Sequence, residues 1–373
     1  MFLNSTKPTI VIAGAGFGGL RAALDLSRAF KKNPRLAQKY NLYLIDQNDH
    51  HLFTPSVYEM AVTMFDDGDA LELKNAVTLP LYQIFKNGPL KFHQARVTKI
   101  DPIEKILNLN DSTKLKFDYL VIALGAETNF YNIPGLKEKA LTLGNLNSAV
   151  RIRNEIEKKF CAALPGNKPI NIVFGGGGVT GVELAGEMRG YIKKLNKKYD
   201  SKTKPRLTII EGQKDILPGF DERMVSWAKK RLGKLGINTV TGDLIEEIRF
   251  ESTLTKSGGR FNFDVLIWSG GIKPNHLVDN LPFKKDPRGR VMIQRNFCPV
   301  FEASGIKNAG GCSNVLVIGD NCCLMEHGEA LPQTAQMAID EGRQAAKIIL
   351  SKIQNKPPPL YQPLPNRYIL PLG

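Results

Sequence analysis

Short apolar runs alternate with longer amphipathic stretches along this chain, and one order of them occurs twice. Residues 9–13 are almost entirely apolar, a glycine-rich turn follows, and apolar positions in residues 21–28 recur with the helical period. A second apolar run covers residues 41–46. This pattern predicts a strand, a tight turn, a helix and a second strand, which is the beginning of a parallel α/β unit.

The same order returns in the middle of the chain, where residues 170–174 and 206–211 are the two apolar runs. A single glycine turn also closes ordinary strand-helix junctions, so either copy alone is compatible with a purely structural role. Because the turn, the helix and the run after it are all duplicated, we predict two nucleotide-binding units of Rossmann type.

The glycines of each turn have the spacing that a bound dinucleotide requires. The first allows the tight turn, the second lets the backbone approach a pyrophosphate, and the third allows the helix to pack closely on the strand. The phosphates would rest on the amides of the helix N-terminus. These glycines are Gly14, Gly16 and Gly19 in the first copy and Gly176, Gly178 and Gly181 in the second.

An acidic residue ends the second apolar run of each copy, Asp46 in the first and Glu211 in the second. A carboxylate at this place can accept hydrogen bonds from the hydroxyls of an adenosine ribose. A protein that holds two dinucleotides typically moves electrons between them, so the duplication favours a redox function.

Further strands are predicted between and after the two units. Residues 91–100 and 105–109 alternate like half-buried strands, and residues 147–160 are helical in pattern. Two buried strands end in glycines, at Gly125 and at Gly271. We expect these two ends to mark the crossings between a first domain and a second one inserted into it.

Composition agrees with a globular α/β protein. With 373 residues, 42% of them apolar, the chain has material for two or three domains. No apolar run approaches the roughly 18 residues of a membrane span, and no signal peptide is visible. The five cysteines show neither zinc spacing nor a Cys-x-x-Cys unit, which predicts no metal site and disfavours a thiol relay; Cys322 and Cys323 are expected to be a reduced pair.

The net charge of +15 predicts a positive surface field that attracts anionic partners. The densest basic cluster, residues 193–198, lacks the interleaved aromatic residues of a nucleic-acid platform. This favours an anionic membrane surface and no nucleic acid, although a solvated face explains a charge run equally well.

Several segments together resemble type II NADH:quinone oxidoreductases, in order over residues 9–350. These are residues 14–19, 51–59, 123–130, 176–187, 318–320 and 334–336. The resemblance implies an α/β fold with two Rossmann-like dinucleotide-binding domains. The FAD-binding domain would be discontinuous, with residues 1–130 and 285–350, the NAD-binding domain would be inserted as residues 150–275, and residues 351–373 would form a C-terminal segment.

The resemblance also implies cofactors and site residues. FAD would be bound non-covalently, and NADH would be a substrate whose electrons pass through the flavin to a quinone of the respiratory chain without proton pumping. Glu183 and Gln336 would be the catalytic residues. The FAD site would comprise Gly14, Gly16, Gly19, Asp46, Pro55, Val97, Gly125, Thr128, Asp320 and Ala335. The NADH site would comprise Gly178, Gly181, Glu183, Glu211 and Gly271.

Some of these residues have simpler alternative roles. Glu183 is either part of the nicotinamide site or a solvated first-turn carboxylate favoured by the helix dipole. Gln336 either faces the quinone or caps the helix that starts there. His51 is expected to pack against its own loop. Glu211 favours NADH over NADPH, because a 2′-phosphate beside a carboxylate is repelled, while Lys214 lies close enough in sequence to weaken that preference.

The chain also departs from the family pattern. Asp340 and Glu341 stand where the family commonly has a glutamine near the quinone head group, which puts the quinone site in doubt. Family members usually continue beyond this C-terminus into amphipathic membrane-binding helices. We therefore expect a peripheral protein on the cytoplasmic side of the plasma membrane, or a soluble one if the anchor is truly absent; a homodimer is left open.

Two other functions remain as alternatives. A sulfide:quinone oxidoreductase shares the FAD unit but needs a redox-active cysteine pair and generally lacks a working second fingerprint. A non-enzymatic flavoprotein would sense NADH and act through partner binding.

Overall fold

The computed structural model describes residues 6–64, 70–166, 168–302 and 314–363. It divides into two compact units. Of the described residues, the first unit comprises 6–52, 78–127, 273–302 and 314–363, and the second comprises 53–64, 70–77, 128–166 and 168–272. The chain passes between them in β10 (Ala126–Thr128) and β19 (Ile272–Pro274), which pair as a two-stranded sheet.

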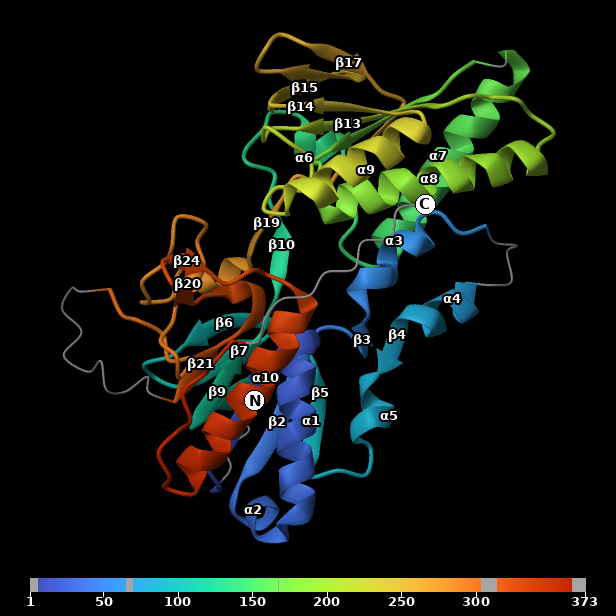
Figure 1. Cartoon of the computed structure of the whole chain (residues 1–373). Helices are drawn as coiled ribbons and strands as arrows, with labels where there is room; N and C mark the ends of the chain where they lie inside the picture. Colours follow the sequence, from blue (N-terminus) through green and yellow to red (C-terminus); the bar gives the residue numbers. More distant parts are fainter. Residues whose placement is uncertain (1–5, 65–69, 167, 303–313, 364–373) are drawn as a thin grey trace. The chain divides into compact units, whose positions relative to one another are not determined.

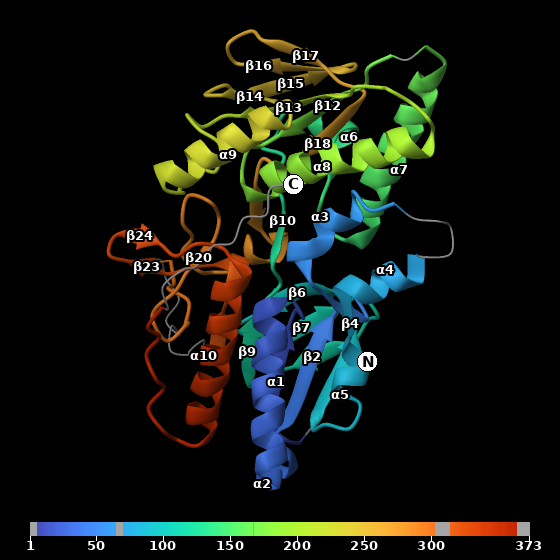
Figure 2. The same cartoon turned by 45° about the vertical axis from the view of Figure 1, so that its right-hand side comes forward.

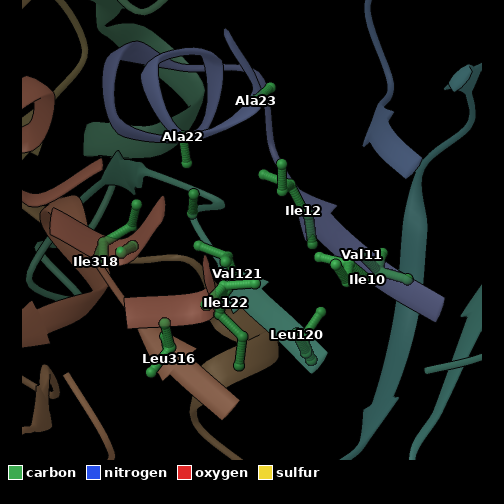
Figure 3. Packing of buried hydrophobic residues seen from close by; sticks show 14 of the residues in the cluster. Ile10, Val11, Ile12, Ala22, Ala23, Leu120, Val121, Ile122, Leu316 and Ile318 are labelled. Atoms are coloured by element: carbon green, nitrogen blue, oxygen red, sulfur yellow. The ribbon is translucent and has the colours of Figure 1, made fainter. Parts of the chain in front are cut away.

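A five-stranded parallel sheet forms the centre of the first unit. Its strands, in spatial order, are β21 (Val315–Val317), β9 (Tyr119–Ile122), β1 (Thr9–Ala13), β2 (Asn41–Asp46) and β5 (Leu90–Gln94). Every residue of β1 is buried, which explains why its sequence is almost entirely apolar. Figure 3 shows the packing: Ile12, Val121 and Leu316 from three neighbouring strands gather with Ala22 of the covering helix.

Two long helices, α1 (Phe17–Lys32) and α10 (Ala335–Ile353), lie side by side against this sheet (Figures 1 and 2). Glycines allow their close approach. A Cβ on Gly342 would lie 2.1 Å from the Gly18 carbonyl oxygen, and one on Gly18 would lie 2.9 Å from the Ala338 carbonyl oxygen. The C-terminal helix is thereby fixed directly against the helix that follows the first glycine turn.

The predicted strand over residues 91–100 is wrong as a single element. β5 ends at Gln94, and β6 (Val97–Asp101) begins a separate antiparallel sheet with β7 (Ile106–Leu109) and β8 (Lys114–Lys116). The chain turns where the Arg96 N–H donates to the Asn110 side chain at 2.7 Å. A side-chain acceptor from a distant residue, invisible in the local pattern, therefore separates the two strands.

The remaining elements of the first unit are short. The helical ones are α2 (Pro34–Lys39), α5 (Leu81–Phe85), η3 (His276–Val278) and η5 (Gly319–Asn321). The strands are β3 (His50–Leu52), β4 (Thr78–Pro80), β20 (Val291–Met292), β22 (Cys322–Cys323), β23 (Met325–Glu326) and β24 (Glu329–Ala330).

The second unit repeats the plan of the first. Its parallel sheet has the order β11 (Leu141–Thr142), β18 (Val265–Trp268), β12 (Asn171–Gly175), β13 (Arg206–Glu211) and β14 (Ile237–Thr241). An antiparallel sheet of β15 (Ile245–Arg249), β16 (Ser252–Thr255) and β17 (Arg260–Asn262) lies between β14 and β18 in sequence. Both units are thus Rossmann-like, and the predicted fold class is confirmed.

Helices complete the second unit. They are α3 (Val57–Met60), α4 (Ala70–Val77), α6 (Leu136–Lys139), α7 (Leu146–Ala163), α8 (Val179–Lys198) and α9 (Glu222–Lys234), with η1 (Thr54–Ser56) and η2 (Leu164–Gly166). The predicted helix over residues 147–160 is confirmed as α7, which a reciprocal capping box of Asn145 and Ser148 starts. None of the helices in the described part of the chain is both long enough and apolar enough to cross a membrane.

Candidate dinucleotide-binding sites

The first glycine turn joins β1 to α1 beside the end of β9. Gly14 has a φ of +104°, and a Cβ there would lie 2.2 Å from the Ala123 carbonyl oxygen. A Cβ on Gly19 would lie 1.9 Å from the Gly14 carbonyl oxygen. Both glycines are therefore required by the fold itself. The chain order of the strands reverses between β1 and β9, which is where open α/β sheets bind ligands.

Gly16 is different, because the fold does not require it. A Cβ there would have nothing within 4 Å, and its backbone is extended. Gly16 is also the N-cap of α1, and no side chain caps that helix start. Open space in front of uncapped helix amides fits a pyrophosphate, so the geometry of this loop suits a bound dinucleotide.

The second glycine turn repeats this geometry in detail. Gly176 has a φ of +109° and would bring a Cβ within 2.5 Å of the Gly270 Cα. A Cβ on Gly181 would lie 2.1 Å from the Gly176 carbonyl oxygen, while one on Gly178 would have nothing within 4 Å. Gly178 is the uncapped N-cap of α8. The second loop therefore also suits a bound dinucleotide.

The acidic residues after the turns also occupy equivalent places. Asp46 accepts from the Ala15 N–H at 2.6 Å and from the Asn48 N–H at 2.8 Å. Burial raises the pKa of Asp46, and these amide hydrogen bonds oppose the shift. The two hydrogen bonds fix the position of the carboxylate that would face the adenosine ribose.

Glu211 binds its own loop in the same way. It accepts from the Gly177 N–H at 2.6 Å and from the Gln213 N–H at 2.8 Å. The residues that follow Glu211 in sequence line an open pocket of about 520 Å³. Its lining consists of residues 213–220, Glu222, Val225, Ser226 and Lys229. Its size suits the adenosine half of a nucleotide.

His51 packs against the first loop, as expected. Its Nδ1 donates to the Ala15 carbonyl at 2.8 Å, and its ring meets Phe17 edge to face at 4.9 Å between centroids. Burial lowers the pKa of His51, which favours a neutral ring. His51 is therefore a support of the loop.

A second group of residues in the first unit surrounds Gly125, which has a φ of +71°. Asn321 is fully buried beside it. With its amide oriented to satisfy its neighbours, Asn321 donates to the Gly125 carbonyl at 3.1 Å and accepts from the N–H groups of Gly125 and Leu124 at 2.9 and 3.1 Å. Sequence reasoning missed Asn321, although it directly follows the Gly319–Asp320 pair that was singled out.

Asp320 lies in the same turn and lines a narrow cavity between η5 and the start of α10. Burial raises the pKa of Asp320, and the Arg290 guanidinium partly opposes that shift. The Gln333 side chain donates to the Asp320 backbone carbonyl at 3.1 Å. The structure thus brings Gly125 and Asp320 together, because Asn321 links their two loops.

The start of α10 decides between two roles of Gln336. Thr334 is the N-cap, and its hydroxyl accepts from the Met337 N–H at 3.2 Å. Ala335 is the first helical residue, and Gln336 is exposed. The interpretation of Gln336 as a cap is therefore wrong, and its side chain is available to a ligand.

Glu183 is buried on α8, so its interpretation as a solvated carboxylate is wrong. Burial raises the pKa of Glu183 to about 7, and the negative charges of Glu187 and Glu59 add to the shift. Tyr58, also buried, has its pKa raised to about 12 by burial and by Glu183. A carboxyl that titrates near neutral pH beside the second glycine turn is a candidate functional group.

The other predicted site residues lie as follows. Val97 begins β6 and is buried, and Gly271, with a φ of +150°, accepts from the Asn129 N–H at 3.0 Å. Pro55 and Thr128 belong to the second unit, whereas the remaining candidate FAD residues belong to the first.

Asp340 and Glu341 point to different partners. The Asp340 carboxylate accepts from the Tyr361 hydroxyl at 2.9 Å and from Arg343 at 3.0 Å. Glu341 accepts from the Gly319 N–H at 2.6 Å. The two carboxyls, adjacent in sequence, therefore have different hydrogen-bond partners.

Cys322 of the first unit lies close to Glu341, with its Sγ 3.7 Å from the Glu341 Oε2. Cys322 and Cys323 are both buried and free, while Cys312 lies outside the described residues. The Cys322 Sγ donates to the Gly319 carbonyl at 3.3 Å. Burial raises the pKa of the Cys322 thiol well above its usual value, so it is not a thiolate at neutral pH.

Comparison with known proteins agrees with this geometry. The family of pyridine nucleotide-disulphide oxidoreductases matches residues 8–342. A type II NADH:quinone oxidoreductase of Staphylococcus aureus is 27% identical over 353 residues, which cover 92% of this chain and 82% of that protein. In structure the chain resembles NDH2 from Plasmodium falciparum in complex with NADH, with a TM-score of 0.77, 20% identity and coverage of 92% and 83%. It also resembles the sulfide:quinone oxidoreductase of Aquifex aeolicus, with a TM-score of 0.74, 18% identity and coverage of 94% and 78%.

Proposed function

The chain belongs to the pyridine nucleotide-disulphide oxidoreductase family, and we propose that this oxidoreductase takes electrons from NADH and passes them through FAD to a quinone. One observation carries the proposal. Both units hold a glycine turn in which the fold demands two glycines and leaves the space at the third open, with a carboxylate bound to the same loop. Two equivalent cradles in one chain suit two dinucleotides that exchange electrons.

The first unit is proposed as the FAD domain. Its loop would hold the pyrophosphate, Asp46 would meet the adenosine ribose, and Val97 would meet the adenine. The linked loops of Gly125 and Asp320 would line the flavin and its ribityl chain, with Ala335 at the isoalloxazine ring. Pro55 and Thr128 are proposed as further residues of the FAD site. The proposed domain boundaries are residues 1–130 and 285–350, with residues 351–373 as a C-terminal segment.

The second unit is proposed as the NADH domain, within residues 150–275. Gly178 and Gly181 would hold the pyrophosphate, and Gly271 would lie near the nicotinamide. Glu211 favours NADH, because its carboxylate and a 2′-phosphate would repel each other. Lys214 lines the adjoining pocket and would weaken that discrimination without reversing it.

The protein contributes mainly position to this reaction. Bound FAD supplies the two-electron chemistry, accepting a hydride and passing electrons on. The uncapped amides of α1 and α8 orient the two pyrophosphates, and Glu183 sets the charge around the nicotinamide. Gln336, exposed at the start of α10, is proposed to bind the quinone head group. The reaction would proceed without proton pumping.

The proposed setting of the protein is an anionic membrane surface. The net charge of +15 supports this, because anionic headgroups attract a basic protein. A peripheral position on the cytoplasmic side of the plasma membrane would bring the protein to its quinone.

An anaerobic titration tests the proposed function. We expect NADH to bleach the oxidised flavin spectrum and a soluble quinone to restore it, with repeated turnover. Gly178→Ala serves as the matched variant, because it should bind FAD normally and respond only at much higher NADH concentration. Bleaching by NADH that quinone cannot reverse would support the NADH-sensing alternative and contradict the enzyme.

The sulfide:quinone alternative is tested in the same cuvette. It requires a reactive thiolate beside the flavin, whereas the thiol of Cys322 is held in its neutral form by burial. We expect sulfide to leave the flavin oxidised. Flavin reduction by sulfide in place of NADH would overturn the proposal.

A further inference from the structure

Glu341 is a buried carboxyl for which the proposed function has no role. It lies on α10, with 4% of its surface exposed. Its Oε2 accepts from the Gly319 N–H at 2.6 Å and lies 3.7 Å from the Cys322 Sγ. Glu341 is therefore hydrogen-bonded to the first residue of η5, the turn that also carries Asp320.

The groups that face Glu341 make its charge unfavourable. Burial raises its pKa to about 8, and the carboxylates of Asp320 and Asp340 reinforce the shift. Hydrogen bonds from the Gly319 amide and the Cys322 thiol oppose it. Two arginines lie near this set. Arg290, whose charge acts on Asp320, is engaged with Asp286 at 2.7 Å, and Arg343 is paired with Asp340 at 3.0 Å. The Cys322 thiol is neutral. At neutral pH Glu341 is thus an uncharged acid.

Three interactions hold η5, the turn to which Glu341 is bound. Its first residue is bound by Glu341, the Asp320 carbonyl accepts from Gln333, and the Asn321 amide binds Gly125. Gln333 and Asn321 are neutral at every relevant pH. Glu341 is therefore the support of this turn whose charge can change near neutral pH.

We propose that Glu341 is a positioning residue for the flavin: as a neutral acid it supports the Gly319–Asn321 turn against the ribityl-phosphate end of FAD, and its ionisation weakens FAD binding. The inference rests on the proposed FAD site. Ionisation would place a second buried negative charge beside Asp320, and the anionic pyrophosphate of FAD would add to the repulsion. If FAD binds better when Glu341 is neutral, proton linkage requires FAD to be held less tightly as the pH rises and Glu341 ionises.

The experiment measures the rate of FAD release from the holoenzyme between pH 6.5 and 9, by the gain of flavin fluorescence on dilution. In the wild type we expect release to accelerate at least about fivefold across this range, within the limit of about tenfold per pH unit for one proton. Glu341→Gln keeps an acceptor for the Gly319 N–H but cannot ionise. Its release rate should change less than about twofold over the same range.

Asp340→Asn is the matched control. It removes the neighbouring carboxylate on the same helix, whose partners are Tyr361 and Arg343. This variant should keep the wild-type rise in FAD release, displaced slightly to lower pH, because one of the negative charges that raise the pKa of Glu341 is removed. Retention of the rise is the decisive feature. An infrared titration of the holoenzyme gives a second readout. The protonated carboxyl band that is lost near pH 8 should be missing from Glu341→Gln and present in Asp340→Asn, while the band of Glu183 stays in both.

The outcomes separate the two proposals. If wild type and Glu341→Gln hold flavin and share one pH profile, the role of Glu341 is overturned while the FAD site stands. If neither protein can be reconstituted with FAD, the proposed function fails together with this inference. A flat profile in Asp340→Asn would assign the effect to the wrong carboxyl and also overturn the inference.

Discussion

Glu183 shows what burial does to a single carboxyl. Its place in the second fingerprint is compatible with a solvated side chain, yet α8 packs with α3 in the second unit and the carboxyl is 8% exposed. Glu59 arrives from α3, far away in sequence. The raised pKa therefore depends on a contact between helices that the sequence does not reveal.

This pKa predicts how stability depends on pH. A carboxyl whose pKa rises from 4.5 to about 7 on folding contributes stability in its neutral form, fully below pH 4.5, and loses it as the pH rises through 7. We expect Glu183→Gln to lack this loss and to exceed the wild type by roughly 1–2 kcal/mol at pH 8, after allowance for solvent screening. Thermal unfolding between pH 5 and 8.5 measures the difference.

Glu187→Gln is the companion variant. It keeps Glu183 but removes the neighbouring charge that adds to its pKa shift. Its stability should still fall with rising pH, beginning at a lower pH than in the wild type. Identical pH profiles for wild type and Glu183→Gln would contradict the assignment.

At the scale of elements, the glycine turns separate folding from binding. Gly19 meets a backbone oxygen that a Cβ would overlap, whereas Gly16 faces open space. The sequence motif names these glycines together, but their three-dimensional surroundings give them different duties. The same division recurs between Gly181 and Gly178.

Alanine substitutions in the first turn should therefore have opposite effects. Gly19→Ala is expected to destabilise the protein by at least about 3 kcal/mol, because backbone must move. Gly16→Ala should change the unfolding free energy by less than about 0.5 kcal/mol and yet lower the flavin content of the purified protein severely. Thermal unfolding and flavin absorbance measure the two quantities. Normal flavin content in a folded Gly16→Ala protein would argue against the cradle.

The elements that the sequence predicts poorly are those defined by distant partners. The strands β1, β2 and β13 are largely apolar runs with clear ends, and their predicted ranges hold. The break between β5 and β6 depends on the side chain of Asn110, which accepts from Arg96. Local periodicity continues through residues 91–100 and cannot show such a break.

At the scale of the whole molecule, the charge of +15 leads to a prediction about membranes. The protein should sediment with vesicles that contain anionic lipid and should not sediment with purely zwitterionic vesicles. Raising the salt to about 0.5 M should release it, because screening shortens the range of the field to a few ångströms. Equal binding to both vesicle types, or binding that salt leaves unchanged, would exclude the electrostatic mechanism.

The sequence by itself determined the fold class and the presence of two nucleotide-binding turns. Both follow from local chemistry: apolar runs that must be buried, glycines at fixed spacing and an acid at the end of the next strand. The alternatives for Glu183 and Gln336 could not be decided in this way, since a motif does not show whether a side chain is buried.

Only the tertiary structure decided which residues act together. It links Gly125 to the Asp320 turn through Asn321, and it binds Glu341 to the same turn. It also gives Glu341 and its sequence neighbour Asp340 different hydrogen-bond partners. These relations depend on α10 packing against α1, from the opposite end of the chain. Contacts between residues hundreds of positions apart arise from the packing of whole elements, and no local pattern encodes them.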